Sequence, residues 1–408
     1  MLKEVLLVII ISMIAQKTYR FYNFMGYARV NDVINYEHGE CSQKFKNITP
    51  GEFKKPIFNT LDADMLPNGL AIFLSSNQHP LLENLHKPLN DSSETTNESI
   101  RSTVFMLDMN HVRDSEPFAI KIINKNTNLE IDPDYFNLYA LSMYQDKFGA
   151  LKFLAANYIT VQMKSKYPNL NQENHFYTIE RFSYHAKKHY LEHSNTFVHD
   201  SNFGELCDLV VINESLFYFT KCHSKLSTKD INLNLEIRNG EIWVFNLNDK
   251  VAYPVAKKLL MPKSIGYLKS KGVIVVSNLA TDGLTLFKRE FDNSLTKLQD
   301  ISLNSFVFSI NIDFSSNILW LTLHPILYQT LSLTNSIESY TSSKLVQLNL
   351  DFRYSQFVNY ELNEYFSSNG TSSFNAISAS IVHRNYFILF SLKNDPRVCS
   401  IKLLNKVI

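Results

Sequence analysis

The chain has 408 residues, of which 45% are hydrophobic, and its formal net charge at pH 7 is +1. A nearly neutral chain without a basic block lacks the electrostatic footprint of a nucleic-acid-binding protein, so we expect no nucleic-acid partner. The sequence also contains no Gly-rich phosphate loop, nucleophile elbow or zinc-protease motif, which excludes several common classes of enzyme.

The N-terminus opens with an apolar run over residues 5–15. A run of about 11 residues matches the core of a signal peptide and is short for a membrane span. We therefore expect residues 1–17 to form a signal peptide or a retained signal-anchor, followed by an N-terminal segment over residues 18–40. The alternative is an N-terminal helix that is buried in the folded body.

Asn-x-Ser/Thr sequons support entry into the secretory pathway, because such sites accept N-linked glycans there. They lie at Asn47, Asn90, Asn97, Asn213 and Asn369. Each sequon is weak evidence alone. Together with the N-terminal run, they favour a secreted or membrane-anchored protein whose folded body is luminal or extracellular.

Four cysteines fit an oxidising compartment. Cys41 and Cys399 stand near the two ends of the expected folded body, so a bridge between them would tie its termini and close a very long loop. Cys207 and Cys222 flank a hairpin with a two-residue turn, which places them directly opposite each other and favours a second disulfide. Two free buried thiols are the alternative for this inner pair.

A strand–turn–strand unit recurs along the chain. In its first copy, over residues 62–76, the turn residues Pro67, Asn68 and Gly69 precede a short apolar run that is typical of a buried strand. Similar hairpins follow at residues 140–156, 208–220, 265–277, 310–322 and 377–390. With the further strands between them, they predict an all-β fold. This is a six-bladed β-propeller over residues 41–408, preceded by the short hydrophobic segment or helix.

Several motifs resemble the paraoxonase/arylesterase family. They are Leu66-Pro-Asn-Gly-Leu-Ala71 with Ser75-Ser76, Val104-Phe-Met-Leu-Asp-Met109, Phe136-Asn137 with Leu141-Ser142, Trp320-Leu-Thr-Leu-His324-Pro325, Asn369-Gly370-Thr371, and Arg397-Val-Cys399. The resemblance covers roughly residues 41–405. It implies a divergent member with a six-bladed propeller, two central calcium ions, a closing Cys–Cys bridge and a retained N-terminal hydrophobic segment.

The resemblance carries over one calcium site. The family's structural calcium is matched here by Asp62, Asp208 and the backbone carbonyl of Leu141, which supply the oxygen ligands that calcium prefers. The alternative is that the carboxylates are solvated turn residues, and this is how we interpret Asp64. The resemblance therefore predicts one structural Ca²⁺ ion.

The family's catalytic calcium site is not carried over. The positions that match its oxygen donors are Leu61, Cys207, Lys263, Phe308 and Ser309. An apolar side chain, an aromatic ring and a lysine cannot hold a divalent cation, so a second, catalytic ion is not expected.

The catalytic histidine pair of the family is also replaced, by Tyr139 and Tyr158. A phenol with a pKa of about 10 is a poor general base near neutral pH. His324 matches a family histidine near the pocket, and a hydrogen-bonded residue of the pocket wall is its simpler interpretation.

His185, His189 and His193, with His199 beyond them, are spaced so that a helix would place the first three on one face. Such a face could hold zinc. The flanking residues favour strands instead, so we do not expect a metal site here.

These inferences predict a calcium-binding propeller of the secretory pathway with a degenerate, non-catalytic hydrolase site. Its expected role is binding or membrane-protein assembly, as in the membrane-anchored members that it resembles, with a membrane surface or membrane proteins as partners. The alternative is a calcium-dependent arylesterase or lactonase that hydrolyses small carboxylic, lactone or organophosphate esters.

Overall fold

The computed structural model describes the chain apart from residue 1, residues 402–408 and several internal stretches. The internal stretches are residues 31, 38–39, 44–58, 66–67, 77–101, 132–134, 160–175, 199–202, 204–205, 223–238, 279–280, 314–317, 333–340, 354–357, 372–373 and 393–395. Three of the sequon positions, Asn47, Asn90 and Asn97, lie outside the described residues, as does His199.

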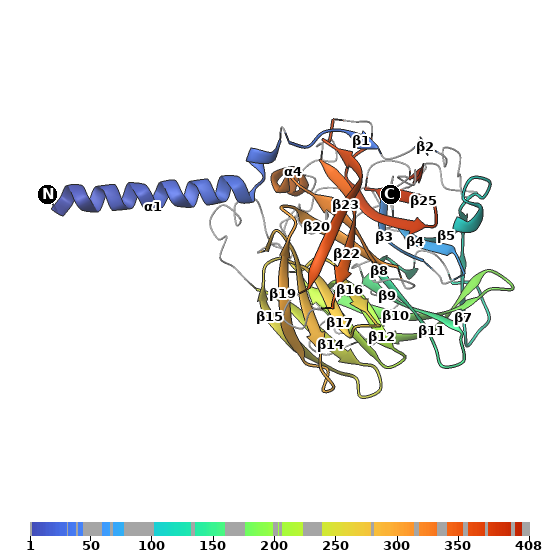
Figure 1. Ribbon diagram of the computed structural model, residues 1–408. Helices are drawn as coiled ribbons and strands as arrows, with labels where there is room; N and C mark the ends of the chain where they lie inside the picture. The colour runs from blue at the N-terminus through green and yellow to red at the C-terminus, as the bar shows by residue number, and fades with distance from the viewer. Residues whose placement is uncertain are drawn as a thin grey trace, which may run out of the picture.

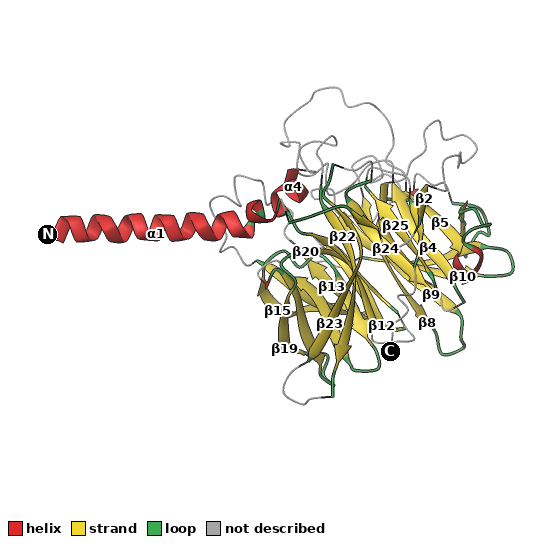
Figure 2. Cartoon of the chain, turned by 45° about the horizontal axis from the view of Figure 1, so that its top comes forward, coloured by secondary structure: helices red, strands yellow, loops and turns green. Residues whose placement is uncertain are grey.

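Six β-sheets surround a central axis, which confirms the predicted six-bladed propeller (Figures 1 and 2). Blade 1 contains β3 (Asn59–Met65), β4 (Leu70–Ser76), β5 (Ser102–Asp108) and β6 (Phe118–Ala119). Blade 2 contains β8 (Leu138–Gln145), β9 (Leu151–Ile159), β10 (Phe176–His185) and β11 (Tyr190–Phe197), with β7 (Lys121–Asn124) parallel to β11. Blade 3 contains β12 (Leu206–Asn213), β13 (Leu216–Lys221), β14 (Gly240–Asn246) and β15 (Val251–Leu259).

The remaining blades follow in chain order. Blade 4 contains β16 (Ile265–Leu268), β17 (Val273–Asn278), β18 (Gly283–Arg289) and β19 (Leu295–Ser302). Blade 5 contains β20 (Phe306–Ile312), β21 (Ile318–His324), β22 (Ser343–Asp351) and β23 (Asn359–Ser368), joined by β1 (Tyr36–Glu37). Blade 6 contains β24 (Ile377–His383), β25 (Tyr386–Ser391), β26 (Arg397–Ser400) and β2 (Cys41–Gln43). The short helices are η1 (Tyr27–Arg29), η2 (Met109–His111) and α4 (Leu327–Ser332).

The two innermost strands of each blade are one of the six predicted hairpins: β3–β4, β8–β9, β12–β13, β16–β17, β20–β21 and β24–β25. Their local sequence explains why. β17 opens with four β-branched apolar residues, Val273 to Val276, and is buried along its whole length. In the first hairpin, Gly69 has a φ of +84°, which a residue with a side chain rarely adopts.

Apolar side chains fill the spaces between neighbouring blades. Between blades 1 and 2, for example, Ile72 and Met106 pack against Leu138 and Phe182. Successive side chains of a strand point to opposite faces, so each blade is buried on both faces by its neighbours. The edges of the innermost strands are left to line the axis, and the site is built there.

The N-terminal strand closes the ring. β2 pairs with β26 in a register that places Cys41 opposite Cys399, and the two residues form a disulfide across 358 positions of sequence. The predicted bridge between the ends of the folded body is confirmed. It joins the last blade to the segment that precedes the first blade.

Cys207 and Cys222 are also bonded, although their strands are not in the predicted register. Leu206 pairs with Lys221 and Asp208 pairs with Thr220, so Cys207 is an extra residue at an irregularity in β12. The expectation that the cysteines lie directly opposite each other is wrong, because two bulges in β12, at Ile212 and at Cys207, each shift the register by one residue. The bulge at Cys207 also sets the direction of Asp208.

The N-terminal helix α1 (Leu2–Phe24) continues past residue 17 and projects away from the propeller (Figures 1 and 2). Residues 10–20 are exposed, including Ile11 and Ile14, so the alternative of a buried helix is wrong for this part of α1. Arg29, just after α1, donates to the carbonyl of Asn304 at 2.6 Å and pairs with Asp282. Within the part of the chain that the structure describes, no helix combines the length and apolarity needed to cross a membrane.

Candidate binding site at the propeller axis

Five of the six innermost strands carry a bulge at equivalent positions near one end of the axis. A bulge redirects a side chain that regular pleating would point elsewhere. The bulged residues are Leu61, Tyr139, Cys207, Phe308 and Ser378. Three of them are positions that the family resemblance assigned to the catalytic calcium, and one matches the catalytic histidine pair.

The structure brings most of these positions together. Tyr139, Cys207, Lys263, Phe308 and Ser309 line one small cavity of about 20 Å³. This volume is enough for a single water molecule or ion. The side chain of Leu61 lies outside what the structure describes, although its backbone belongs to β3.

Tyr139 and Tyr158 do not line this cavity together. Tyr158 is buried behind it against Tyr177, at a ring-centroid distance of 5.3 Å, and Tyr177 in turn contacts Tyr139 at 6.0 Å. The Tyr139 hydroxyl is buried and has no hydrogen-bond partner among the described residues. Burial raises the pKa of Tyr139 well above its ordinary value, so the phenol stays protonated near neutral pH and cannot accept a proton from water.

His324 is fully buried at the end of β21 and is hydrogen-bonded through both ring nitrogens. Nε2 lies 2.8 Å from the Ile377 carbonyl and must donate to it, so Nδ1 accepts from the Thr330 hydroxyl at 3.1 Å. The ring stacks on Phe308 at a centroid distance of 4.8 Å. Burial lowers the pKa of His324 to about 4, so the ring is neutral and structural near pH 7.

We expect His324 to make the folded state sensitive to acid. Its pKa is about 4 when folded and about 6.5 when unfolded, so its contribution is complete above pH 6.5 and is lost as the pH falls toward 4. The loss is about 3 kcal/mol in the free energy of unfolding. Urea denaturation at several pH values should show a shallower acid slope for His324→Gln than for wild type. An unchanged slope in His324→Gln would contradict this assignment.

Two aspartates of β3 lie on the axis. Asp62 and Asp64 stand two residues apart, so their side chains leave the same face of the strand, and both line a second, larger cavity. Asp62 Oδ2 accepts the Leu141 N–H at 2.7 Å, and Asp64 Oδ2 accepts the Met143 N–H at 3.3 Å. The interpretation of Asp64 as a solvated turn residue is wrong, because β3 extends to Met65 and carries Asp64 along the axis.

Asp208 makes the equivalent connection between later blades. Its Oδ2 accepts the Ile265 N–H at 3.0 Å and the Ser264 hydroxyl at 2.7 Å. The Ser264 oxygen in turn accepts the Ile310 N–H at 3.1 Å. Edge strands present unpaired N–H groups, and these side chains satisfy them while joining one blade to the next.

The carboxylates of the axis are poorly compensated. Desolvation and the nearby Asp208 charge raise the pKa of Asp62 well above its usual value. Desolvation also raises the pKa of Asp64 to about 7 and that of Asp208 to about 6. Lys263 faces Asp208 and Asp62, and desolvation lowers the pKa of its ammonium group while both carboxylates oppose that change. Asp62 and Asp208 therefore share one ammonium group, which is not among the groups that shift the pKa of Asp64.

The axis fits one calcium ion better than two. Asp62 and Asp208 line both cavities, with Leu141 beside them in the larger one, and their mutual repulsion is what a divalent cation would relieve. Calcium would be held there by carboxylate and carbonyl oxygens and would supply positive charge between the blades. Among the described residues, no group of three or more His, Cys, Asp and Glu side chains is arranged to hold a metal ion.

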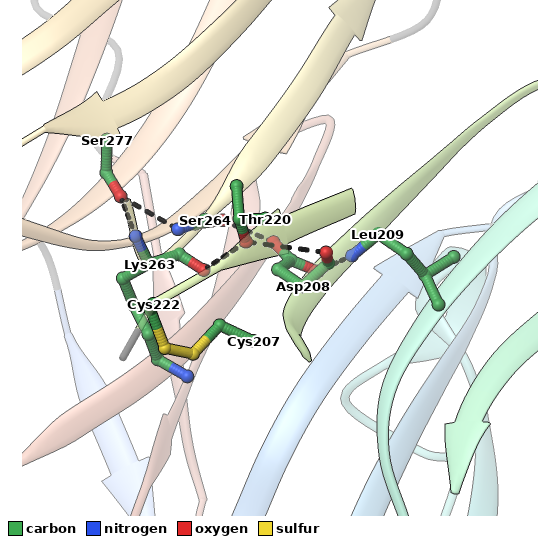
Figure 3. The surroundings of a disulfide bond; sticks show 8 residues. All are labelled: Cys207, Asp208, Leu209, Thr220, Cys222, Lys263, Ser264 and Ser277. Carbon is green, nitrogen blue, oxygen red and sulfur yellow. Dashed lines mark hydrogen bonds between the residues drawn. A yellow bond between two sulfur atoms is a disulfide. The ribbon is translucent and has the colours of Figure 1, made fainter. Parts of the chain in front are cut away.

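The small cavity lacks several of the oxygen donors that a second calcium ion would need. Cys207 is bonded to Cys222, and the backbone N–H groups of Lys263 and Ser264 are fixed by the Ser277 hydroxyl at 2.9 and 2.7 Å (Figure 3). The Lys263 ammonium lies 5.3 Å from the centre of the Phe308 ring. Three of the positions that match the catalytic calcium, Cys207, Lys263 and Phe308, therefore offer no side-chain oxygen to a divalent cation. The side-chain oxygens that remain in this cavity belong to Asp62, Asp208, Tyr139 and three serines.

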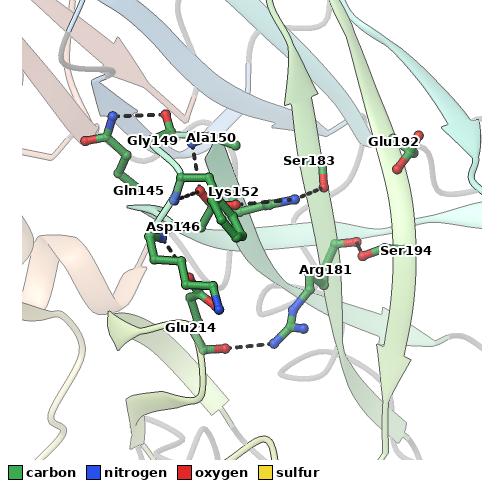
Figure 4. Close-up of polar contacts among 12 residues, drawn as sticks. Gln145, Asp146, Gly149, Ala150, Lys152, Arg181, Ser183, Glu192, Ser194 and Glu214 are labelled. Atoms are coloured by element: carbon green, nitrogen blue, oxygen red, sulfur yellow. Dashed lines mark hydrogen bonds and ion pairs between the residues drawn. The ribbon is translucent and has the colours of Figure 1, made fainter.

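The hairpin turns of blades 2 and 3 meet at the mouth of the larger cavity (Figure 4). Glu214 Oε1 accepts the Lys147 N–H at 2.7 Å, and the Glu214 carbonyl accepts from Arg181 at 2.9 Å. Lys152 donates to Ser183 at 2.7 Å on the same side. These contacts fix the rim of the cavity on the rigid blades.

The histidine series does not form a helix. His185 ends β10, His193 lies in β11, and His189 lies in the turn between them with a φ of 50°. His193 pairs with Glu180 at 2.9 Å, and His185 with Glu192 at 3.5 Å. The expectation of strands here is confirmed, and the histidines have separate partners.

Two sequon asparagines are described. Asn213 is exposed at the turn after β12, and its side-chain oxygen accepts from the Ser215 N–H at 2.9 Å. Asn369 is half-buried after β23, and its side-chain oxygen accepts from the Thr371 hydroxyl at 2.7 Å. Asn213 also belongs to the rim of the larger cavity.

Comparison with known proteins agrees with this geometry. The arylesterase family model matches residues 56–393. Serum paraoxonase/arylesterase 2 of Gallus gallus is 23% identical over 268 residues, and serum paraoxonase/arylesterase 1 of Homo sapiens is 20% identical over 264 residues. Serum paraoxonase/lactonase 3 of Homo sapiens is 23% identical over 270 residues. Each match spans 65% of this chain and 66% of the relative, just under two thirds of its length.

A solved structure described provisionally as a gluconolactonase also superposes on the chain. The TM-score is 0.45 at 8% identity, and the match covers 91% of this chain and 95% of the other.

Proposed function

The chain belongs to the arylesterase family, and we propose that it is a calcium-binding member that binds other molecules rather than hydrolysing esters. The observation that carries this proposal is the small cavity, where Lys263, Phe308 and the disulfide-bonded Cys207 lie together. The buried, neutral His324 and the phenol of Tyr139 supply no effective base near pH 7. Catalytic hydrolysis through a metal-bound water lacks both its metal ligands and its base in this arrangement.

The proposed calcium ion lies between Asp62 and Asp208. Titration calorimetry of the chelator-treated protein should give one Ca²⁺ ion per chain, and Asp208→Asn should weaken binding at least about ten-fold by removing one anionic ligand. The control Asp300→Asn makes the same change of charge at a surface residue that is paired with Lys297. The affinity of this variant for Ca²⁺ should equal that of wild type. Two bound ions, or an unchanged affinity in Asp208→Asn, would contradict the proposal.

We place the folded body in the lumen of the secretory pathway or outside the cell. Two disulfides and the exposed sequon at Asn213 support this localisation. Protein expressed through the secretory route should lose mass on treatment with an N-glycosidase. The loss should be smaller in Asn213→Gln by the mass of one glycan. A wild-type chain without glycans would contradict this localisation.

We also propose a role in membrane-protein assembly, with a membrane surface or membrane proteins as partners. It is supported by α1, whose exposed apolar side chains include Ile11 and Ile14. The full chain should co-sediment with membranes. The double variant Ile11→Asp/Ile14→Asp should stay in the supernatant. A matched pair of exposed sites on the propeller, Leu298→Asp with Leu362→Asp, should leave sedimentation unchanged.

The second candidate function is a calcium-dependent arylesterase or lactonase that acts on small esters. The names of the matched relatives and the unpartnered hydroxyl of Tyr139 favour it. Calcium-dependent turnover of a simple aryl ester would decide for this candidate.

A further inference from the structure

The larger cavity lies on the other side of Asp62 and Asp208 from the family's catalytic positions. The small cavity is lined by the earlier residues of the innermost strands, such as Tyr139 and Phe308, and the large one by later residues, such as Met143 and Ile312. Only Asp62 and Asp208 line both. The axis is therefore nearly filled at one end and hollow at the other.

The hollow end has the size and access of a ligand site. Its volume is about 730 Å³, within the range of roughly 300–1,000 Å³ that is common for small-molecule pockets. Gln145, Lys147, Glu214 and Lys269 are exposed residues of the hairpin turns and form its rim, so the cavity opens to solvent. The rim is held by the contacts between blades 2 and 3 (Figure 4).

Much of the wall of this cavity is apolar. The apolar part is formed by Met143, Val210, Ile212, Tyr267, Ile310 and Ile312, which come from four different blades, and the polar residues Ser142 and Asn311 lie among them. These side chains stand on the innermost strands, which are fixed by backbone pairing on one side. The walls are therefore preformed, and they suit an apolar body rather than a sugar or a peptide backbone.

The inner end of the cavity is acidic. Asp64 lines it together with Asp62 and Asp208, whereas Lys263 lies in the other cavity. The Asp64 oxygens accept only backbone N–H groups, from Met65 at 2.8 Å and Met143 at 3.3 Å, and no ion pair of Asp64 occurs among the described residues. A cavity with apolar wall residues that ends at Asp64, which has no cationic partner among the described residues, is complementary to a molecule with an apolar body and a cationic end.

We propose that this cavity binds a small amphiphilic organic cation, whose ammonium group lies against Asp64 and whose apolar body lies along the walls. The site is separate from the family's catalytic positions and does not depend on hydrolysis. It also does not require calcium, because Asp64 lies two residues beyond Asp62, closer to the open mouth. The proposal therefore stands or fails independently of the proposed function.

The test uses the full chain in chelator and three probes that share a ten-carbon chain. Decyltrimethylammonium is the cation, decanol is neutral and decanoate is the anion. In titration calorimetry, the protein should bind the cation at least ten-fold more tightly than it binds decanol, and it should not bind decanoate. Equal affinity for the cation and decanol would overturn the proposal, because the cavity would then recognise only apolar surface. Absence of binding would overturn it as well.

Two variants locate the site. Asp64→Asn keeps a side-chain oxygen for the Met143 N–H and should weaken binding of the cation about ten-fold, without changing the affinity for decanol. Glu361→Gln makes the same change of charge at an exposed residue of β23 and should bind the cation as wild type does. Val210→Trp fills the cavity and should abolish binding of all three probes. Unchanged cation binding in both Asp64→Asn and Val210→Trp would place the ligand elsewhere and overturn the proposal.

Discussion

The free energy of unfolding should fall by about 6 kcal/mol when Cys41 and Cys399 are both replaced by serine. Their disulfide spans 358 positions, so reducing it frees almost the whole chain in the unfolded state. In the folded state the same bridge holds β2 against β26, where three residue pairs and the adjoining Glu40–Ser400 contact join this segment to the last blade. The loss therefore combines loop entropy with weaker closure of the ring.

The matched control is the second disulfide. Cys207 and Cys222 are 15 positions apart, and replacing both by serine should cost about 3 kcal/mol in the loop-entropy model. Urea denaturation followed by the fluorescence of Trp243 and Trp320 reports on the unfolding of blades 3 and 5 in both variants. Equal losses for the two pairs, or a loss below about 1 kcal/mol for the terminal pair, would show that the bridge does not close the propeller.

Replacing Lys263 by methionine should destabilise the calcium-free protein by about 3–5 kcal/mol. Lys263 carries the cationic group that compensates Asp208 and Asp62, whose raised pKa values report their desolvation and mutual repulsion. Methionine retains the apolar stem of the side chain and removes its charge, which leaves desolvated carboxylates without a partner. The effect should be largest near neutral pH, where these carboxylates ionise.

Calcium should restore part of this loss, because an ion between Asp62 and Asp208 supplies the missing positive charge. Adding Ca²⁺ should therefore raise the melting temperature of Lys263→Met by more than it raises that of wild type, and thermal unfolding of both proteins measures the difference. Lys269→Met, at the exposed rim of the large cavity, is the matched control and should unfold like wild type. A Lys263→Met protein as stable as wild type in chelator would mean that its ammonium does not compensate the axis.

The fold was predictable because its signals are local. The six inner hairpins are apolar runs separated by turn residues, and each run has the length of a strand. Closure was predictable from the positions of Cys41 and Cys399. The register of β12 was not, because the bulge at Cys207 depends on how the strand meets the axis rather than on the turn that follows it.

The candidate site was predictable only where a family match existed. That match pointed to Tyr139, Cys207, Lys263 and Phe308, which the structure brings into one cavity. Asp64 was missed because it follows Asp62 in a segment with turn chemistry close by. The two-residue spacing of the aspartates within a strand was the available signal that both face the same way.

The large cavity gave no signal in the sequence. Its walls come from residues such as Val210, Tyr267 and Ile312, which are ordinary apolar strand residues when read singly. What makes them a pocket is the meeting of four inner strands around the axis, which is a property of no single segment.

The most direct test of the account is hydrolysis of phenyl acetate and an aromatic lactone by the glycosylated protein, with calcium and after chelation, while thermal unfolding is followed in parallel. We expect no turnover above the buffer rate in either condition and a lower melting temperature after chelation. Turnover that requires calcium would contradict the assignment of a non-catalytic axis, and Tyr139 and His324 would then be the first residues to replace.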